Sequence, residues 1–254
     1  MQEPAPGWLK RPSEADTTDL VMAAVRTYAG QAGRLWAVAA VLSAPSALLG
    51  LWIGAAYGGT AAVPPAGYLA AIAAVGLLTA ALNVVALGSV TRMADTPGLR
   101  VGQALAAGLA CFWRLAGVGL LTALLVAVGL ICLVIPGIYL AVALSLVTPA
   151  VVLGGAGVRA AMRTSYRLAA RGTFWRAAET LLLAAIATTV VAWALGVAPA
   201  FASVLQVMRG PGGAVPPSLG QQLLAYIGKV LTLPFGTIVA VVLYRDLEAR
   251  KGAG

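Results

Sequence analysis

The chain has 254 residues, of which 61% are hydrophobic and only 10% are charged, whereas soluble domains carry about 25% charged residues. A water-exposed surface cannot be built from this composition, which excludes an ordinary soluble fold. The net charge of +9 does not indicate nucleic acid, because the basic residues lie between apolar stretches rather than on a separate polar domain. Anionic lipid headgroups are the expected partner.

The first 18 residues contain acids and turn-forming residues beside Lys10 and Arg11, and no apolar core follows these bases directly. This pattern is not that of a cleavable signal peptide. We therefore expect residues 1–18 to form a flexible cytoplasmic tail and the first apolar stretch to be a membrane span.

Six apolar stretches follow, each of about 20 residues and therefore long enough to cross about 30 Å of hydrocarbon. They are 35–56, 67–90, 115–135, 137–155, 178–200 and 221–243. We predict an all-α, polytopic membrane protein with one six-helix transmembrane domain over 19–247 and a cytoplasmic C-terminal tail over 248–254.

The connections between these stretches alternate in charge, and most of the basic residues fall on every second one. Because basic residues stay on the cytoplasmic side, this alternation predicts three transmembrane hairpins with both termini in the cytoplasm. The bias toward Ala, Gly, Val and Arg suggests a bacterial genome, and we therefore expect a bacterial inner membrane. The third and fourth stretches are joined by little more than Pro136-Gly137, where a proline is expected to end one helix and a glycine to permit the turn. So short a connection leaves open a re-entrant pair.

Three charged connections have a helical pattern and resemble each other, which indicates an amphipathic interfacial helix before each hairpin. They cover 19–33, 101–112 and 158–175. The last contains arginines spaced every four residues, which form one basic stripe while Leu168 and Ala169 face away from it. These arginines are Arg159, Arg163, Arg167 and Arg171.

The basic stripe has two interpretations. Positive charge orients a protein during insertion without any further purpose, and it also forms a platform for anionic phospholipid, each base near the surface contributing about 1 kcal/mol. We take five residues as lipid-binding candidates, namely Arg159, Arg163, Arg167, Arg171 and Arg176.

Residues suited to catalysis are scarce. The chain has no histidine, which excludes histidine-dependent nucleophile systems and histidine-ligated zinc, and its few acids form no evident converging pair. We predict no catalytic residue, no metal and no cofactor. Polar residues within membrane spans are energetically costly, so each one calls for an explanation. Three of them are candidates for a transport site under an alternative function: Asn83, Glu179 and Lys229. The spacing of Arg176 and Glu179 predicts a local ion pair.

Several runs between residues 100 and 250 resemble the membrane domain attached to some bacterial glycerophosphoryl diester phosphodiesterases. They are Ile135-Pro-Gly-Ile-Tyr-Leu140, Pro149-Ala-Val-Val-Leu153, Ser165-Tyr-Arg-Leu168, Phe174-Trp-Arg176 and Leu243-Tyr-Arg-Asp-Leu-Glu-Ala-Arg250. The resemblance implies a six-helix membrane domain, and it does not imply hydrolysis, because the catalytic domain of that family uses histidines. The chain departs from the family pattern at Ala143 and Gly154, where a basic and an acidic residue are common.

The function that we expect is therefore non-catalytic: the protein organises anionic lipids or partner proteins, including a second copy of itself, through its basic cytoplasmic face. The alternative is a permease or channel for a small or amphiphilic substrate. It requires a midplane cavity lined by Asn83, Glu179 or Lys229.

Overall fold

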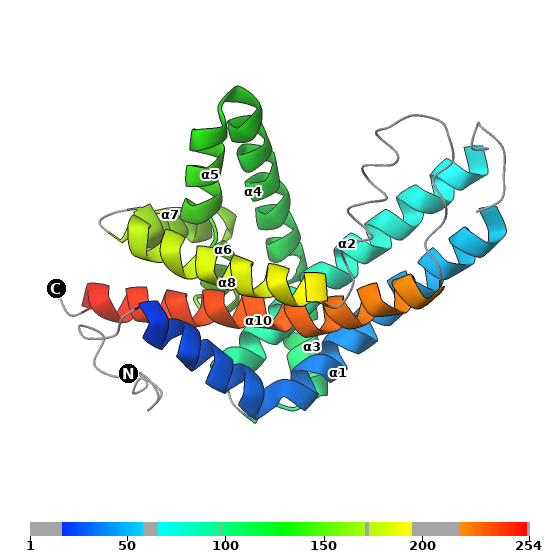
Figure 1. The fold of residues 1–254 in the computed structure, drawn as a ribbon. Helices are drawn as coiled ribbons and strands as arrows, with labels where there is room; N and C mark the ends of the chain where they lie inside the picture. The colour runs from blue at the N-terminus through cyan, green and yellow to red at the C-terminus, as the bar shows by residue number, and fades with distance from the viewer. Residues whose placement is uncertain (1–16, 58–65, 97, 171–172, 195–218, 253–254) are drawn as a thin grey trace.

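The computed structural model describes residues 17–57, 66–96, 98–170, 173–194 and 219–252. These residues contain helices and no strand. The helices are α1 (Thr17–Tyr57), α2 (Ala66–Asp95), α3 (Val101–Ala110), α4 (Phe112–Cys132), α5 (Val134–Ala143), α6 (Val147–Val152), α7 (Val158–Ala170), α8 (Phe174–Ala194) and α10 (Leu219–Gly252) (Figure 1).

Six helical segments are long and apolar enough to cross a membrane, which confirms the predicted all-α polytopic architecture. They are Thr17–Leu49, Ala73–Asp95, Phe112–Cys132, Val134–Val152, Phe174–Val191 and Gln222–Arg250. The first turn of α1 and the last turn of α10 lie at the same end of the molecule (Figure 1).

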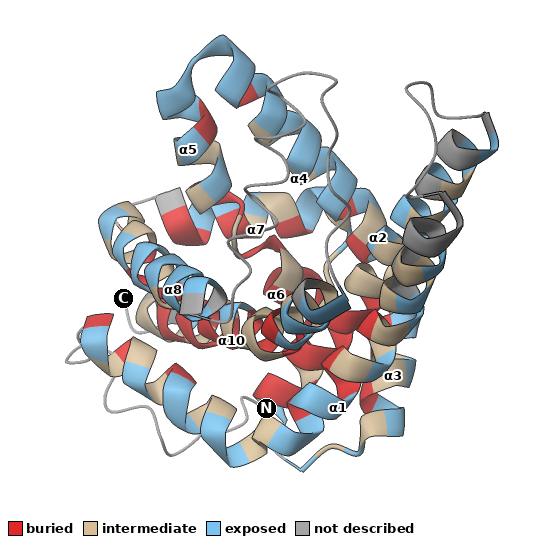
Figure 2. Cartoon of the chain, turned by 45° about the vertical axis from the view of Figure 1, so that its right-hand side comes forward, coloured by how far each residue is buried: buried red, intermediate tan, exposed pale blue. Residues whose placement is uncertain are grey.

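The best-packed part of the bundle surrounds α10, which packs against α1, α8 and α2. Its interior is made of large side chains that are almost fully buried, including Leu20, Leu35, Met93, Val151, Leu243 and Leu247. Buried residues gather in this region, whereas the α4–α5 hairpin that projects from it is mostly exposed (Figure 2). The region around α10 is therefore a compact core. We call the projecting hairpin of α4 and α5 the arm.

α1 combines two predicted elements in one 41-residue helix. The interfacial helix expected over 19–33 and the first span run on without a break, although α1 bends in its first half (Figure 1). Only Gly30 and Gly33 interrupt the local helix-forming sequence, and a single glycine costs a helix about 1 kcal/mol without ending it. The other two segments predicted as interfacial form separate helices, α3 and α7.

The turn between the third and fourth stretches lies at Leu133, three residues before the predicted position. Pro136 stands in the first turn of α5, where its missing N–H is not needed for the helix. Gly137 serves packing: a Cβ there would lie 2.6 Å from the backbone nitrogen of Leu130. The prediction that Pro136 ends a helix was wrong, because both residues belong to the start of the next one.

The fourth span is interrupted, since α5 ends at Ala143 and α6 begins at Val147. Within the predicted C-terminal tail over 248–254, α10 continues to Gly252. Charged side chains at 248 and 250 pair with residues of the same helix and so stabilise its last turns.

Candidate functional site

The basic stripe lies on α7 as predicted. Arg159, Arg163 and Arg167 are exposed, and the opposite face of the helix is buried through Ala161, Ser165, Leu168 and Ala169. The Ser165 hydroxyl donates a hydrogen bond of 2.8 Å to the carbonyl of Ala143, which fixes α7 against the end of α5. Arg171 lies outside the described residues.

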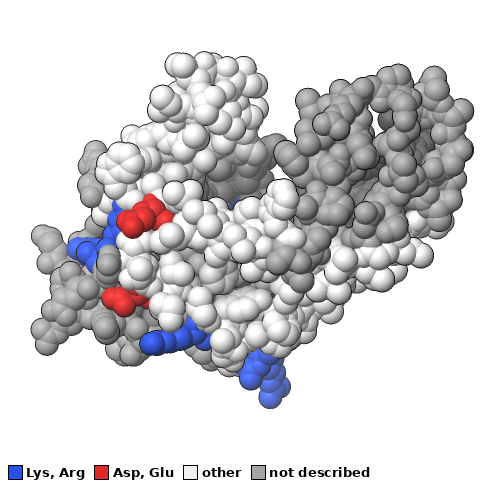
Figure 3. Space-filling model, in the orientation of Figure 1, with Lys and Arg blue, Asp and Glu red and all other residues white. Residues whose placement is uncertain are grey.

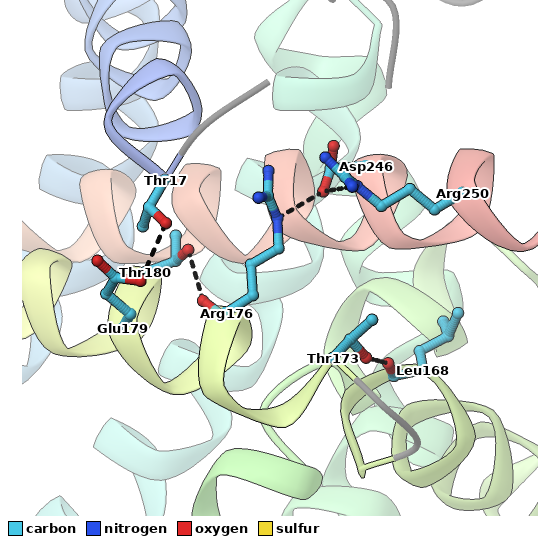
Figure 4. Close-up of polar contacts among 8 residues, drawn as sticks. All are labelled: Thr17, Leu168, Thr173, Arg176, Glu179, Thr180, Asp246 and Arg250. Carbon is cyan, nitrogen blue, oxygen red and sulfur yellow. Dashed lines mark hydrogen bonds and ion pairs between the residues drawn. The ribbon is translucent and has the colours of Figure 1, made fainter. Parts of the chain in front are cut away.

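Asp246 of α10 joins two arginines at the same end of the bundle (Figure 4). Its side chain is fully buried, and its Oδ2 accepts hydrogen bonds from Arg176 Nε at 3.2 Å and from Arg250 Nε at 3.0 Å. Arg176 comes from α8, so the pair ties α8 to α10. The other carboxylate oxygen, Oδ1, is buried without a hydrogen-bond partner among the described residues.

A second set of ion pairs ties α2 to α10. Arg245 lies 2.6 Å from Asp95 at the end of α2 and 3.3 Å from Glu248. The Tyr244 hydroxyl donates to Glu248 at 3.1 Å. We call the part of the molecule that holds these pairs and α7 the charged end. On the visible face of the described chain, charged atoms lie at this end and along the lower edge, where Figure 1 draws α1 (Figure 3).

A hollow of about 210 Å³ lies between α7 and the last turns of α10. It is lined by Thr164, Arg167, Leu168 and Glu248. It therefore places a guanidinium, a hydroxyl and a carboxylate around a small open space at the charged end. This combination suits a phosphate-containing headgroup with a polar substituent.

Aromatic side chains lie close together where α5 contacts α7 and the start of α8. Tyr139 stacks on Phe174 with ring centroids 4.9 Å apart, and its hydroxyl donates to that of Tyr166 at 3.5 Å. Trp113 and Trp175 stand more than four-fifths exposed at the starts of α4 and α8. Tryptophan and tyrosine favour the membrane–water interface, so this end has the composition of an interfacial layer.

The three candidate transport residues are not brought together by any hydrogen bond or ion pair in the described chain. Glu179 accepts a hydrogen bond of 3.1 Å from the Thr17 hydroxyl (Figure 4). The expected Arg176–Glu179 ion pair does not form, because Arg176 reaches Asp246 instead. Asn83 and Lys229 make no such bond with described residues, and none of the three lines the hollow.

The acidic partners at the charged end are what sequence reasoning missed. Asp95, Asp246 and Glu248 each neutralise an arginine of the described chain. Two of these ion pairs could have been predicted from the sequence. Asp246 and Arg250 are four residues apart, and Arg245 and Glu248 are three residues apart, and side chains at these spacings meet on a helix. No group of three histidine, cysteine, aspartate or glutamate side chains among the described residues could hold a metal ion.

The fold and this polar end define a multi-pass α-helical membrane protein. No family model matches the chain, and no curated protein or solved structure matches it. The resemblance of residues 100–250 to the phosphodiesterase-associated membrane domain stays a prediction.

Proposed function

We propose that this chain is a non-catalytic membrane protein that binds anionic phospholipid through the exposed arginines of α7 and so organises lipid at the membrane surface. The observation that carries the proposal is the difference between the acids and the bases at the charged end. Asp95, Asp246 and Glu248 are engaged by arginines of α8 and α10. Arg159 and Arg163 stay exposed, with no acidic partner among the described residues.

The charges of Arg159 and Arg163 therefore have no acidic partner in the described chain, and a phosphate group outside the protein would supply one. Arg167 lines the hollow beside Thr164, which supports this hollow as the seat of a headgroup. Arg176 belonged to the predicted lipid-binding set. We assign it a structural role instead, because its guanidinium donates to the buried Asp246.

Charge also supports a membrane and an orientation for this proposal. Basic residues are retained on the cytoplasmic side of a bacterial inner membrane, which would place the charged end, with the start of α1 and the end of α10, in the cytoplasm. Anionic lipids of the cytoplasmic leaflet would then lie beside α7.

The test compares two double variants with the same change in charge. Arg163→Gln with Arg167→Gln removes two bases from α7, whereas Arg26→Gln with Arg34→Gln removes two exposed bases from α1. Binding of short-chain phosphatidylglycerol to purified protein is titrated by native mass spectrometry, with phosphatidylcholine as the neutral lipid. At about 1 kcal/mol per base, the α7 variant should bind phosphatidylglycerol about 30-fold more weakly.

The α1 variant should keep most of its affinity for phosphatidylglycerol. Equal losses in the two variants, or unchanged binding in both, would mean that the stripe on α7 serves orientation alone. Retention of another protein in place of lipid would identify a protein partner and contradict the lipid proposal.

A further inference from the structure

The hollow between α7 and the last turns of α10 is lined by side chains of both charges. The lining residues come from both helices and are Thr164, Arg167, Leu168 and Glu248. Arg167 and Leu168 follow Thr164 by three and four residues, so the three lie on one face of α7. The hollow thus differs from the exposed positions of Arg159 and Arg163, where the charge is positive only.

Glu248 is held in place by its own helix and keeps capacity for a ligand. Its Oε1 accepts a hydrogen bond of 3.1 Å from the Tyr244 hydroxyl, and its Oε2 accepts one of 3.3 Å from Arg245 Nη1. The side chain is 48% exposed. Because a carboxylate has about four lone-pair sites, each oxygen can accept a further hydrogen bond. The hollow therefore contains a positioned, negatively charged acceptor.

A headgroup that contains both a phosphate and a primary ammonium complements the two charges of the hollow. The guanidinium of Arg167 is a donor for phosphate oxygens, and the Thr164 hydroxyl can provide a further one. A primary ammonium has N–H donors and no acceptor, so it forms charge-assisted hydrogen bonds with a carboxylate such as that of Glu248. Leu168 offers apolar surface to the methylene groups that join phosphate and ammonium.

Other phospholipid headgroups lack one of these features. The choline nitrogen carries a positive charge, but its methyl groups leave it no N–H to donate. The glycerol of phosphatidylglycerol has hydroxyl donors, but it brings no positive charge to Glu248. The ethanolamine headgroup has the phosphate, the positive charge and the N–H donors together.

We propose that the hollow is a subsite for an aminophospholipid, with the phosphate against Arg167 and the primary ammonium against Glu248. The proposal rests on the proposed function in one respect, because the charged end must lie among lipid headgroups. It adds a second class of lipid, since the exposed arginines of α7 attract net negative charge whereas the hollow selects a zwitterion.

The test is a series of lipids that differ only in methylation of the headgroup nitrogen. Binding of short-chain phosphatidylethanolamine, its N-monomethyl and N,N-dimethyl forms, and phosphatidylcholine to the purified protein is titrated by native mass spectrometry. Each methyl group removes an N–H donor while the phosphate and the net charge stay the same. We expect phosphatidylethanolamine to bind about tenfold more tightly than phosphatidylcholine, which corresponds to one hydrogen bond between charged groups.

Glu248→Gln keeps the size of the side chain and removes its charge, so this variant should bind all four lipids about equally. Glu179→Gln is the matched control, because Glu179 is also exposed and does not line the hollow. This control should keep the tenfold preference. Equal affinities of the unsubstituted protein for all four lipids, or the same loss of preference in both variants, would overturn the proposal.

Phosphatidylglycerol separates this proposal from the proposed function. If the methylation series shows no preference while Arg163→Gln with Arg167→Gln still weakens phosphatidylglycerol binding, the subsite alone is wrong. If the preference is present and that double variant binds phosphatidylglycerol normally, the proposed function alone is wrong.

Glycerophosphoethanolamine separates a lipid from a soluble ligand, because it has the same headgroup without acyl chains. At equal concentration it should not displace phosphatidylethanolamine from the protein. Displacement would identify a soluble phosphoamine as the ligand and would overturn the assignment of the hollow to a lipid.

Discussion

The charged end and the α4–α5 arm hold their helices together in different ways. At the charged end, long side chains are almost fully buried and ion pairs join α2, α8 and α10. In the arm, two helices contact each other closely through Gly129 and Gly137, and nearly every other tip side chain faces outward. The charged end thus resembles the interior of a soluble protein, whereas the arm needs lipid as its solvent.

This difference shows where the sequence places its polar groups. Charges are costly in hydrocarbon, and the buried carboxylate at the charged end is paired across helices that are far apart in the chain, since Arg176 and Asp246 are 70 residues apart. The arm avoids the cost by containing none. Substitutions in either region test this difference. The larger loss of stability is expected at the charged end, where a buried charge loses its partner.

Asp246→Asn should cause the largest loss of stability. The substitution keeps the shape of the side chain but removes the charge that Arg176 and Arg250 share, and removing one partner of a buried ion pair costs about 3 kcal/mol or more. SDS titration of the purified protein, followed by circular dichroism, measures the change in the free energy of unfolding.

Glu248→Gln is the matched control for this substitution. Glu248 is about half exposed and pairs with Arg245 of the same helix, so its loss should cost under about 1 kcal/mol. If Asp246→Asn cost no more than Glu248→Gln, the buried pair would not be what holds α8 against α10.

A smaller effect is expected in the arm from Gly137→Ala. The new Cβ would lie 2.6 Å from the backbone nitrogen and side chain of Leu130, so α4 and α5 must separate, at a cost of about 1–3 kcal/mol. Gly119→Ala on the same hairpin meets nothing within 4 Å and should be neutral or slightly stabilising. The same SDS titration applies, and equal stabilities of the two variants would show that the close approach of the helices is unimportant.

The elements that are predictable from sequence are those determined by a single helix. The exposed positions of Arg159 and Arg163, and the burial of Leu168 and Ala169 behind them, follow from helical periodicity alone. The apolar stretches likewise predict the spans, because hydrocarbon thickness sets their length. The fused α1 shows the limit of this reasoning, since glycine weakens a helix without marking its end.

The site at the charged end required knowledge of packing between helices. The four-residue spacing of Asp246 and Arg250 predicts their contact, but only the packing of α8 on α10 brings Arg176 to the same carboxylate. The turn at Leu133 was misplaced for a related reason. Proline and glycine were assigned to a reversal, whereas Gly137 permits close approach of two helices.

The central claim is that the charged end lies at the membrane surface, with the exposed arginines of α7 beside the lipid headgroups. A density map of the full chain in a lipid nanodisc, with a bound antibody fragment as a size marker, tests it most directly. We expect the disc boundary to pass at the level of Arg163 and Trp175. A map that places Arg163 away from the headgroup layer of the disc would contradict the account.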